Sequence, residues 1–402
     1  MHKKIGAILL VAGTCIGSGM IALPMVLVKL GLIPSILIML FIWFIMYYTS
    51  LINLELNLQA GHGLSLGALG RYYSGRTAEI IGVVSLKLLS YSLLAVFIYG
   101  GSSVLQELFA SHMAVEYSFN AIATGYALGA MALLMLPIHL IDYINRFLFI
   151  GLLAVVAILI IGLALAVEWS HLPLFSEHYT DLSVWSGIIP VVFTSFGFQV
   201  IFHTLTNYCH QNAKMLKQAF FWGSLIPAVV YILWTSSVLS VVYHDNPLFY
   251  NEMIAGKIEV GELIQVLSGI AKWQSVQLLV WWISLLAIAT SVLGVGVGLC
   301  DSLKNMLVKI IPQTTSRTIA ASVITVMPAY LVAIFVPNAF IAALGFAGMI
   351  LAVIAILLPV YLFRKTNEQK LHYPELKSKG LMGLSVAVGF IVILSEMYNM
   401  WH

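Results

Sequence analysis

The chain has 402 residues, of which 61% are hydrophobic and only 9% are charged, and its mean hydropathy is +1.00. Soluble domains contain about 45–50% apolar and about 25% charged residues, so a water-soluble globular fold is excluded and lipid must surround most of the chain. The net charge of +3 says little by itself, and three cysteines (Cys15, Cys209, Cys300) give neither an even disulfide framework nor metal-ligand spacing.

A helix that crosses a bilayer needs about 20 mostly apolar residues. Eleven stretches satisfy this rule: 5–29, 32–56, 78–105, 119–138, 147–167, 184–206, 217–243, 275–300, 317–336, 338–362 and 380–398. Only "VPN" (336–338) separates the ninth stretch from the tenth, and Pro337 predicts a tight turn there. We expect the first stretch to remain as a span rather than be cleaved, because hydrophobicity resumes directly after Cys15.

The basic residues predict the orientation, because they accumulate in cytoplasmic segments. With the N-terminus inside, fifteen fall on the cytoplasmic side: Lys3, Lys4, Arg71, Arg76, Arg146, Lys214, Lys217, Lys304, Lys309, Arg317, Arg364, Lys365, Lys370, Lys377 and Lys379. Only Lys29, Lys257 and Lys272 fall outside. The sequence therefore predicts a cytoplasmic N-terminus and a C-terminus on the outer face.

The polar connections are too short for a soluble domain, so residues 1–402 form one integral membrane domain. The longest are 57–79 on the inner side and 243–274 on the outer side. Helical periodicity around Ile258 to Ile270 predicts a short helix that covers the outer face. A chain of this kind without a nucleotide-binding or redox motif is typical of a transporter.

Two of the spans contain residues that favour an interrupted helix. They are "AGTCIGSG" in the first span and "FTSFGFQ" (193–199) in the sixth. If 5–167 and 184–362 are two repeats followed by an extra helix at 380–398, these interruptions occupy equivalent positions. Paired broken helices in inverted halves indicate the binding site of a secondary transporter, because unwound backbone is tolerated in a membrane only where it lines protein or water.

The chemistry of these breaks suits a zwitterion. A half-helix that begins near Gly17 directs free N–H groups at a carboxylate, while freed carbonyls and hydroxyls of the sixth span accept from an ammonium group. The alternative interpretation of Gly13 and Gly17 is a G-x-x-x-G face that packs two helices together.

At these residues the chain resembles the bacterial hydroxy/aromatic amino acid permeases, the tyrosine- and tryptophan-specific group. The resemblance rests on "VAGTCIGSGMIALP", "DYINRFLF", "IPVVFTSFGFQ", "GSLIPAVVYILW", "AIATSVLGVGVGLCD" and "LGFAGMILAVIAILLP", which cover nearly the whole chain in order. It implies an all-α membrane protein of eleven transmembrane helices, with the LeuT-type five-plus-five inverted repeat, broken first and sixth helices and one additional C-terminal helix. It also implies symport of an aromatic amino acid driven by an ion gradient, most often of protons.

The candidate substrate-binding residues lie at the two breaks and in a side-chain pocket. They are Thr14, Gly17, Ser18 and Gly19 in the first span; Thr194, Ser195, Phe196, Gly197, Phe198 and Gln199 in the sixth; and Tyr91 in the third. Gln199 departs from the family pattern, which often has histidine at this place, and this change removes one proton carrier.

The coupling ion has two candidate sites. The oxygen set of LeuT-type sodium carriers is matched by Gly13, Ile16, Ala287, Thr290 and Ser291, although Thr290 and Ser291 could bond only their own helix backbone. For a proton, an ionisable residue within a span is the usual carrier. Lys87 is the deepest such residue and Glu55 its potential partner, while snorkelling of Lys87 toward the cytoplasmic face remains the alternative.

The sequence thus predicts a symporter that imports an aromatic L-amino acid, tyrosine first, across the bacterial inner membrane under a proton gradient by alternating access. Sodium-coupled uptake of tryptophan or another large neutral amino acid is the alternative. Neither a cofactor, nucleic acid nor an obligate protein partner is expected, only substrate, ion and lipid. An integral-membrane enzyme or a channel is disfavoured because no catalytic motif or filter ring is visible in the sequence.

Overall fold

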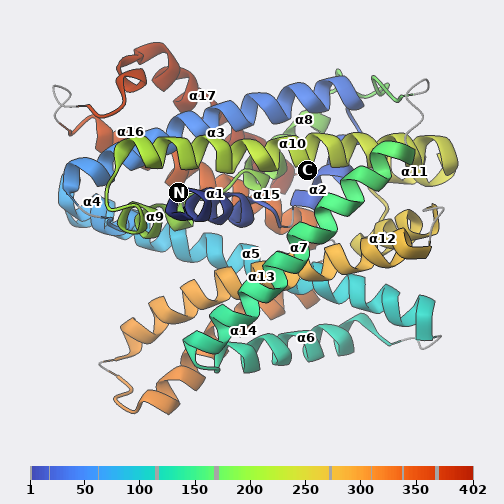
Figure 1. The fold of residues 1–402 in the computed structure, drawn as a ribbon, viewed down its shortest axis with the longest axis horizontal. Helices are drawn as coiled ribbons and strands as arrows, with labels where there is room; N and C mark the ends of the chain where they lie inside the picture. The colour runs from blue at the N-terminus through green and yellow to red at the C-terminus, as the bar shows by residue number, and fades with distance from the viewer. Residues whose placement is uncertain are drawn as a thin grey trace.

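The computed structural model describes residues 2–17, 19–61, 63–113, 117–166, 172–270, 274–308, 310–336, 339–366 and 371–401, and all the regular structure within these ranges is helical (Figure 1). The helices are α1 (His2–Cys15), α2 (Gly19–Leu27), α3 (Leu32–Ala60), α4 (Leu66–Ser74), α5 (Arg76–Met113), α6 (Phe119–Leu134), α7 (Ile138–Ala166), α8 (Leu182–Ser195), η1 (Gln199–Ile201), α9 (Phe202–Tyr208), α10 (Ala213–Asp245), α11 (Pro247–Ile254), α12 (Val260–Ile270), α13 (Gln274–Leu307), α14 (Thr314–Phe335), α15 (Ala339–Ala352), η2 (Val353–Leu357), α16 (Leu358–Phe363), η4 (Pro374–Lys377) and α17 (Lys379–Trp401).

Within the described ranges, seven helices are long and apolar enough to cross a membrane: α3, α5, α10, α13, α14, the α15–α16 helix and α17. The bent pair α1–α2 adds an eighth if it forms one span, and α6 and α8 are shorter apolar helices. Helix is found in every one of the predicted ranges, but α5 and α10 extend past them at both ends. The predicted ranges end where the residues become polar, whereas the backbone hydrogen bonds of a helix can continue through polar residues.

The outer connection between α10 and α13 folds into two helices. The prediction of a helix around Ile258 to Ile270 is confirmed by α12. The sequence reading missed α11, although Asn246 caps its start by accepting from the Phe249 N–H at 3.2 Å and Pro247 occupies its first turn. The predicted turn at Pro337 lies outside the described residues, between the end of α14 and the start of α15.

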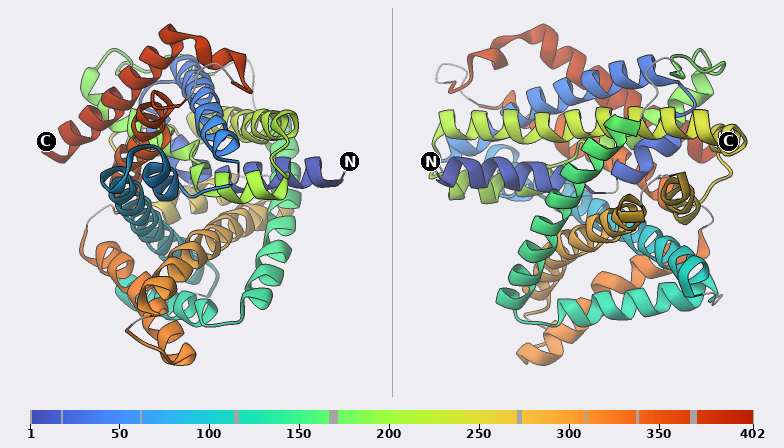
Figure 2. Two further views of the ribbon diagram at one scale, coloured as in Figure 1. Left: turned by 90° about the vertical axis from the view of Figure 1, so that its left-hand side faces the viewer. Right: turned by 45° about the vertical axis from the view of Figure 1, so that its right-hand side comes forward.

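α2 and the two breaks lie in the interior of the bundle, whereas α1 exposes Ile5, Leu9 and Leu10 on its outer face. α1 runs along α10, α2 packs against α10 and α8, and α8 is flanked by α15 and α17 (Figures 1 and 2). α13 crosses α7 and packs against α5 and α14 on the other side of the molecule. The two breaks, between α1 and α2 and between α8 and α9, are therefore surrounded by protein.

The segment that precedes α17 is fixed by one buried carboxylate. Glu55, at the end of α3, is 0% exposed. Its Oε2 accepts from the backbone N–H groups of His372 and Tyr373 at 3.0 and 3.2 Å. Its Oε1 lies 3.1 Å from Nδ1 of His372 and accepts from Nε2 of Gln59 at 2.9 Å. A buried carboxylate needs such donors, so Glu55 joins this segment to α3.

The same segment is tied to α10 by two further contacts. The Tyr373 hydroxyl donates to the carbonyl of Ala213 at 3.0 Å. Lys217 forms an ion pair with Glu375, and this hydrogen bond holds the pKa of the Glu375 carboxyl below its usual range. Residues 371–378 thus connect α3 with the start of α10.

We expect Glu55→Ala to lower the free energy of unfolding by about 2–3 kcal/mol, because it leaves two buried backbone N–H groups without an acceptor. The change would appear as a lower apparent melting temperature of the purified protein in detergent. Glu252→Ala, at an exposed site in α11, is the matched control and should melt like the original chain. Equal melting of all three proteins would contradict this account.

Candidate functional site

The first break separates α1 from α2, whose axes differ by 49°. Helical hydrogen bonding ends with the Ile16 N–H, which donates to the Ala12 carbonyl at 3.0 Å. It resumes where the Met20 N–H donates to the Gly17 carbonyl at 3.1 Å. Several glycines in this stretch lower its helix propensity by about 1 kcal/mol each. Ser18, a predicted site residue, lies outside the described residues.

The second break follows α8. The N–H groups of Phe196 and Gly197 bond back to the carbonyls of Phe193 and Thr194 at 3.3 and 2.9 Å. These short turns close the helix, which restarts only at η1. The sequence prediction of interruptions at both places is thus matched by the backbone.

One tyrosine hydroxyl joins the two breaks. Tyr231 of α10 is 0% exposed, and its Oη lies 2.6 Å from the carbonyl oxygen of Cys15 and 3.2 Å from that of Ser195. These carbonyls end α1 and α8. The ring packs edge-on against Phe196, with centroids 5.5 Å apart. The sequence analysis missed this residue; the signal was a tyrosine among apolar residues in "AVVYILW", since a buried tyrosine hydroxyl requires a partner.

Two predicted glycines let these elements meet. A Cβ at Gly19 would lie 2.7 Å from the Tyr231 hydroxyl and 2.8 Å from Cβ of Ser195. A Cβ at Gly17 would lie 2.7 Å from Oγ of Ser291 in α13. Gly19 has no room for a side chain, and a Cβ at Gly17 would require the Ser291 hydroxyl to move, so the breaks approach α8, α10 and α13 through bare backbone.

Prolines inside the helices remove further backbone bonds, and neighbouring helices supply the missing donor at Pro24, Pro190 and Pro328. Proline has no N–H, so the carbonyl four residues earlier lacks its helical donor. In α2, Pro24 leaves the carbonyl of Met20 free, and Nε1 of Trp234 in α10 donates to it at 2.5 Å. α10 therefore supplies donors to both half-helices of the first break.

The same rule explains Tyr91, which the sequence analysis assigned to a substrate pocket. Pro328 in α14 leaves the carbonyl of Ile324 without its helical donor, and the Tyr91 hydroxyl donates to that carbonyl at 2.9 Å. The hydroxyl thus serves the contact between α5 and α14.

The hydroxyls predicted to bind substrate are engaged with their own helices. Thr14 Oγ1 donates to the Leu10 carbonyl at 2.8 Å, and Ser195 Oγ donates to the Val191 carbonyl at 2.9 Å. A hydroxyl that donates its hydrogen keeps its lone pairs. These oxygens are therefore acceptors, which suits an ammonium group.

The two hydroxyls of the predicted sodium site also bond carbonyls of their own helix. Thr290 Oγ1 lies 2.8 and 3.1 Å from the carbonyls of Leu286 and Ala287, and Ser291 Oγ lies 2.7 Å from that of Ala287. These are bonds within α13, as the alternative interpretation expected. Ser291 nevertheless reaches the first break at Gly17.

The aromatic side chain at the predicted site is buried among other aromatic rings. Phe198 is 0% exposed and packs against Phe202 and Phe220, with ring centroids 5.6 Å apart in both pairs. Gln199 accepts from the Phe198 N–H at 2.9 Å through Oε1, and its Nε2 lies 3.8 Å from Sδ of Met46. Gln199 therefore bonds the backbone of the second break and contacts α3.

The two ionisable candidates are not paired with each other. The Lys87 ammonium contacts Sδ of Met306 in α13, whereas Glu55 is held by the 371–378 segment as described above. The sequence-based expectation that Glu55 is the partner of Lys87 is therefore wrong for this conformation. The reason is that residues 371–378 return to α3, which the linear sequence does not reveal.

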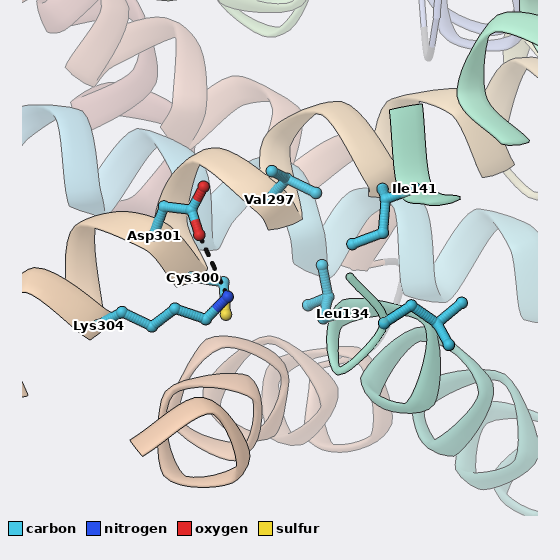
Figure 3. A pocket seen from close by; sticks show the side chains of 7 residues that line it. Leu134, Ile141, Val297, Cys300, Asp301 and Lys304 are labelled. Carbon is cyan, nitrogen blue, oxygen red and sulfur yellow. Dashed lines mark hydrogen bonds and ion pairs between the residues drawn. The ribbon is translucent and has the colours of Figure 1, made fainter. Parts of the chain in front are cut away.

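Two cavities lie away from the breaks. One, of about 20 Å³, is lined by Leu134, Leu136, Ile141, Val297, Cys300, Asp301 and Lys304 (Figure 3). It includes the ion pair of Asp301 and Lys304 at 3.2 Å and is too small for an amino acid. The other, of about 310 Å³, has a wholly apolar lining that includes Phe41 and Trp185. Neither matches a zwitterion, so the breaks remain the candidate site.

Comparison with known proteins identifies the family. The model of the tryptophan/tyrosine permease family matches residues 1–402. The chain is 30% identical to the tyrosine-specific transport system 1 of Haemophilus influenzae over 93% of this chain and 91% of that protein. It is 26% identical to the tryptophan-specific transport protein of Pseudomonas aeruginosa, over 91% and 87%. It is 27% identical to glutamine transporter 2 of Aliivibrio fischeri, over 98% and 99%.

Among solved structures, the fold is similar to that of Mhp1, a transporter of the nucleobase-cation-symport-1 family, in a closed conformation with bromovinylhydantoin bound. The TM-score is 0.61 at 12% identity, covering 99% of this chain and 91% of that chain. At this identity the similarity concerns the fold alone. Together, the family match, the apolar helices and the broken helices lead to one conclusion: the chain belongs to the tryptophan/tyrosine permease family of multi-pass membrane transport proteins and is not an enzyme.

Proposed function

We propose that this protein is a secondary active symporter that imports an aromatic amino acid, tyrosine first, across the bacterial inner membrane by alternating access, driven by a proton gradient. The observation that carries the proposal is the pair of facing helix breaks joined by the Tyr231 hydroxyl. The protein would have eleven crossings in one domain, with repeats at 5–167 and 184–362 and α17 as the additional helix.

The substrate backbone would bind between the breaks. The N-terminus of α2, at Gly19, presents backbone N–H groups and a partial positive charge to the carboxylate. The carbonyls of Cys15 and Ser195 each use one lone pair for Tyr231 and keep a second for the ammonium group. Ser18 and the hydroxyls of Thr14 and Thr194 complete the proposed set.

The aromatic side chain of the substrate would replace part of the cluster around Phe198. Phe196, Gly197 and Gln199 belong to the same turn and would line this pocket, with the ring of Tyr91 as a more distant wall. We place tyrosine first among the candidate substrates because polar groups near the pocket can hydrogen-bond its phenol hydroxyl. A relative named as a glutamine transporter makes glutamine the necessary competitor in any test.

The orientation follows from charge. α4 and α9, next to the basic connections, lie at one end of the long axis, and α11 and α12 lie at the other end (Figure 1). The two termini also lie toward opposite ends (Figure 2). We assign the first end to the cytoplasm, where basic residues accumulate.

For coupling we propose protons, as the family resemblance implies, with Lys87 and Glu55 as the ionisable groups found from the sequence. Glu55 already has several donors in a fixed loop contact, so Lys87 is the better candidate of the two. The alternative is sodium bound by Gly13, Ile16, Ala287, Thr290 and Ser291, which is supported by the approach of Ser291 to Gly17.

The direct test is uptake of radiolabelled tyrosine by proteoliposomes under an inward proton gradient, an inward sodium gradient or neither. We expect the proton gradient alone to drive accumulation, at most about tenfold per pH unit for one proton per substrate. Unlabelled tryptophan should compete, and glutamine and leucine should not. Uptake that requires sodium would assign coupling to the α1–α13 oxygen set, and a lack of any tyrosine or tryptophan exchange would overturn the proposal.

We expect Gly19→Ala to reduce uptake about tenfold, corresponding to ~1.4 kcal/mol, because the new methyl group would overlap the Tyr231 hydroxyl and Ser195. Initial uptake rates at equal protein in the membrane measure this effect. Gly294→Ala is the control, since a Cβ there has no neighbour within 4 Å. Uptake by the Gly19 variant at the control rate would exclude a site built on close backbone contact.

We expect Tyr231→Phe to lower the apparent melting temperature, because it leaves two buried carbonyls without their donor at a cost of about 1–3 kcal/mol. Uptake should fall as well, since the geometry of both breaks depends on this hydroxyl. Tyr143→Phe, at a position 73% exposed, should change neither quantity. A Tyr231 variant with normal melting would show that the hydroxyl does not hold the breaks together.

A further inference from the structure

A carboxylate that the sequence analysis did not single out is buried between three apolar helices. Glu396 of α17 is 5% exposed, and its Oε2 lies against the backbone of Gly345 in α15, where a Cβ would overlap it. α17 packs on α8, α15 and η2. Glu396 therefore faces the protein interior rather than lipid, although it lies on a helix long and apolar enough to span the membrane.

No cation is available to neutralise this group from the helices around it. α8, α15 and η2 contain no lysine, arginine or histidine within their described ranges, and the first residue of α17, Lys379, lies at the opposite end of that helix. The other titratable group nearby on α17 is Tyr398, which is 46% exposed. An ionised carboxylate without a cation is costly in such surroundings, so the neutral, protonated form is the one that fits here.

The neighbouring amide has a structural explanation that does not require Glu396. Pro190 in α8 leaves the carbonyl of Ser186 without its helical donor, and Nδ2 of Asn399 donates to that carbonyl at 2.9 Å. The same Nδ2 lies 3.5 Å from Oε2 of Glu396. Asn399 thus supplies the donor that the Ser186 carbonyl lacks because of Pro190. Glu396 adds an ionisable group that the packing of α17 on α8 does not need.

The position of Glu396 links it to the second break. Gly345 follows Leu344, whose carbonyl lies 2.9 Å from Oγ1 of Thr194, directly before the end of α8. On the same helix, Gly348 packs closely against the Pro190 carbonyl. α15 is therefore held between α8 on one side and the Glu396 carboxyl on the other, and a charge at Glu396 would act on both contacts.

We propose that Glu396, rather than Lys87 or Glu55, binds the proton that is coupled to transport, an inference that rests on the proposed symport function. In this conformation one carboxylate oxygen carries the proton, and the neutral group allows α17, α15 and α8 to pack. When these helices separate, the O–H bond breaks, the proton passes to water that enters between them, and the charged carboxylate keeps the junction open. Asn399 and Ser186 lead from Glu396 toward the exposed ends of α17 and α8, which gives the path for proton uptake.

The test compares Glu396→Gln with the original chain in proteoliposomes. Glutamine mimics the protonated acid but cannot release a proton. We expect proton-driven tyrosine accumulation to fall from as much as about tenfold per pH unit to no accumulation, while exchange of labelled for unlabelled tyrosine continues. Glu177→Gln, at an exposed site between α7 and α8, should accumulate tyrosine like the original chain. Glu396→Asp should regain accumulation with an altered pH profile.

Three results would overturn the inference. One is normal accumulation by Glu396→Gln. Another is loss of both exchange and accumulation in the Gln and Asp variants alike, which a purely structural carboxyl would produce. The third is accumulation by the original chain that responds to sodium alone. The first two results leave the proposed transport of aromatic amino acids intact, and the third contradicts the proton coupling that both proposals share. Failure of the transport function itself differs from all three, because the original chain would then exchange neither tyrosine nor tryptophan.

Discussion

The architecture depends on one constraint, the need of every backbone carbonyl in an apolar interior to find a donor. The two helix breaks and the prolines Pro24, Pro190 and Pro328 interrupt the regular helical pattern, and a neighbouring helix supplies a donor at each of them. Tyr231 serves the ends of α1 and α8, Trp234 serves the carbonyl freed by Pro24, and Asn399 serves the one freed by Pro190. These repairs fix where α10 and α17 must lie, so irregular backbone and helix packing determine each other.

The same constraint explains how an uncharged site can recognise a charged substrate. Where helical bonding stops, N–H groups and carbonyls remain that can bind a carboxylate and an ammonium group without any buried side-chain charge. Gly17 and Gly19 keep this surface bare, since a side chain at either would overlap Ser291 or Tyr231. The family's named relatives transport tyrosine, tryptophan or glutamine. Because the α-amino and α-carboxyl groups are common to these amino acids, the proposed function assigns selectivity to the side-chain pocket rather than to the breaks.

α8 and residues 371–378 are held by different kinds of contact. α8 is held through Thr194 and Gly348 by α15, while residues 371–378 are fixed to α3 and α10 through Glu55 and Tyr373. A carboxylate with several donors, such as Glu55, stabilises one arrangement. A carboxyl with a single amide neighbour, such as Glu396, changes its surroundings when it gains or loses a proton. Burial alone therefore does not distinguish a structural acid from a functional one; the number of its donors does.

The sequence by itself determined the membrane class, the helical composition, the family and the places where the first and sixth spans break, because hydropathy and glycine content are local properties. It also contained the signals of α11 in Asn246 and Pro247, which the hydropathy reading passed over. Only the tertiary structure decided which distant residues bond one another. Tyr231 reaches Cys15 across 216 positions, Tyr91 reaches Ile324 across 233, and Glu55 binds His372 rather than Lys87. Such pairings depend on how helices cross, and no periodicity within a single helix encodes the neighbour it will meet.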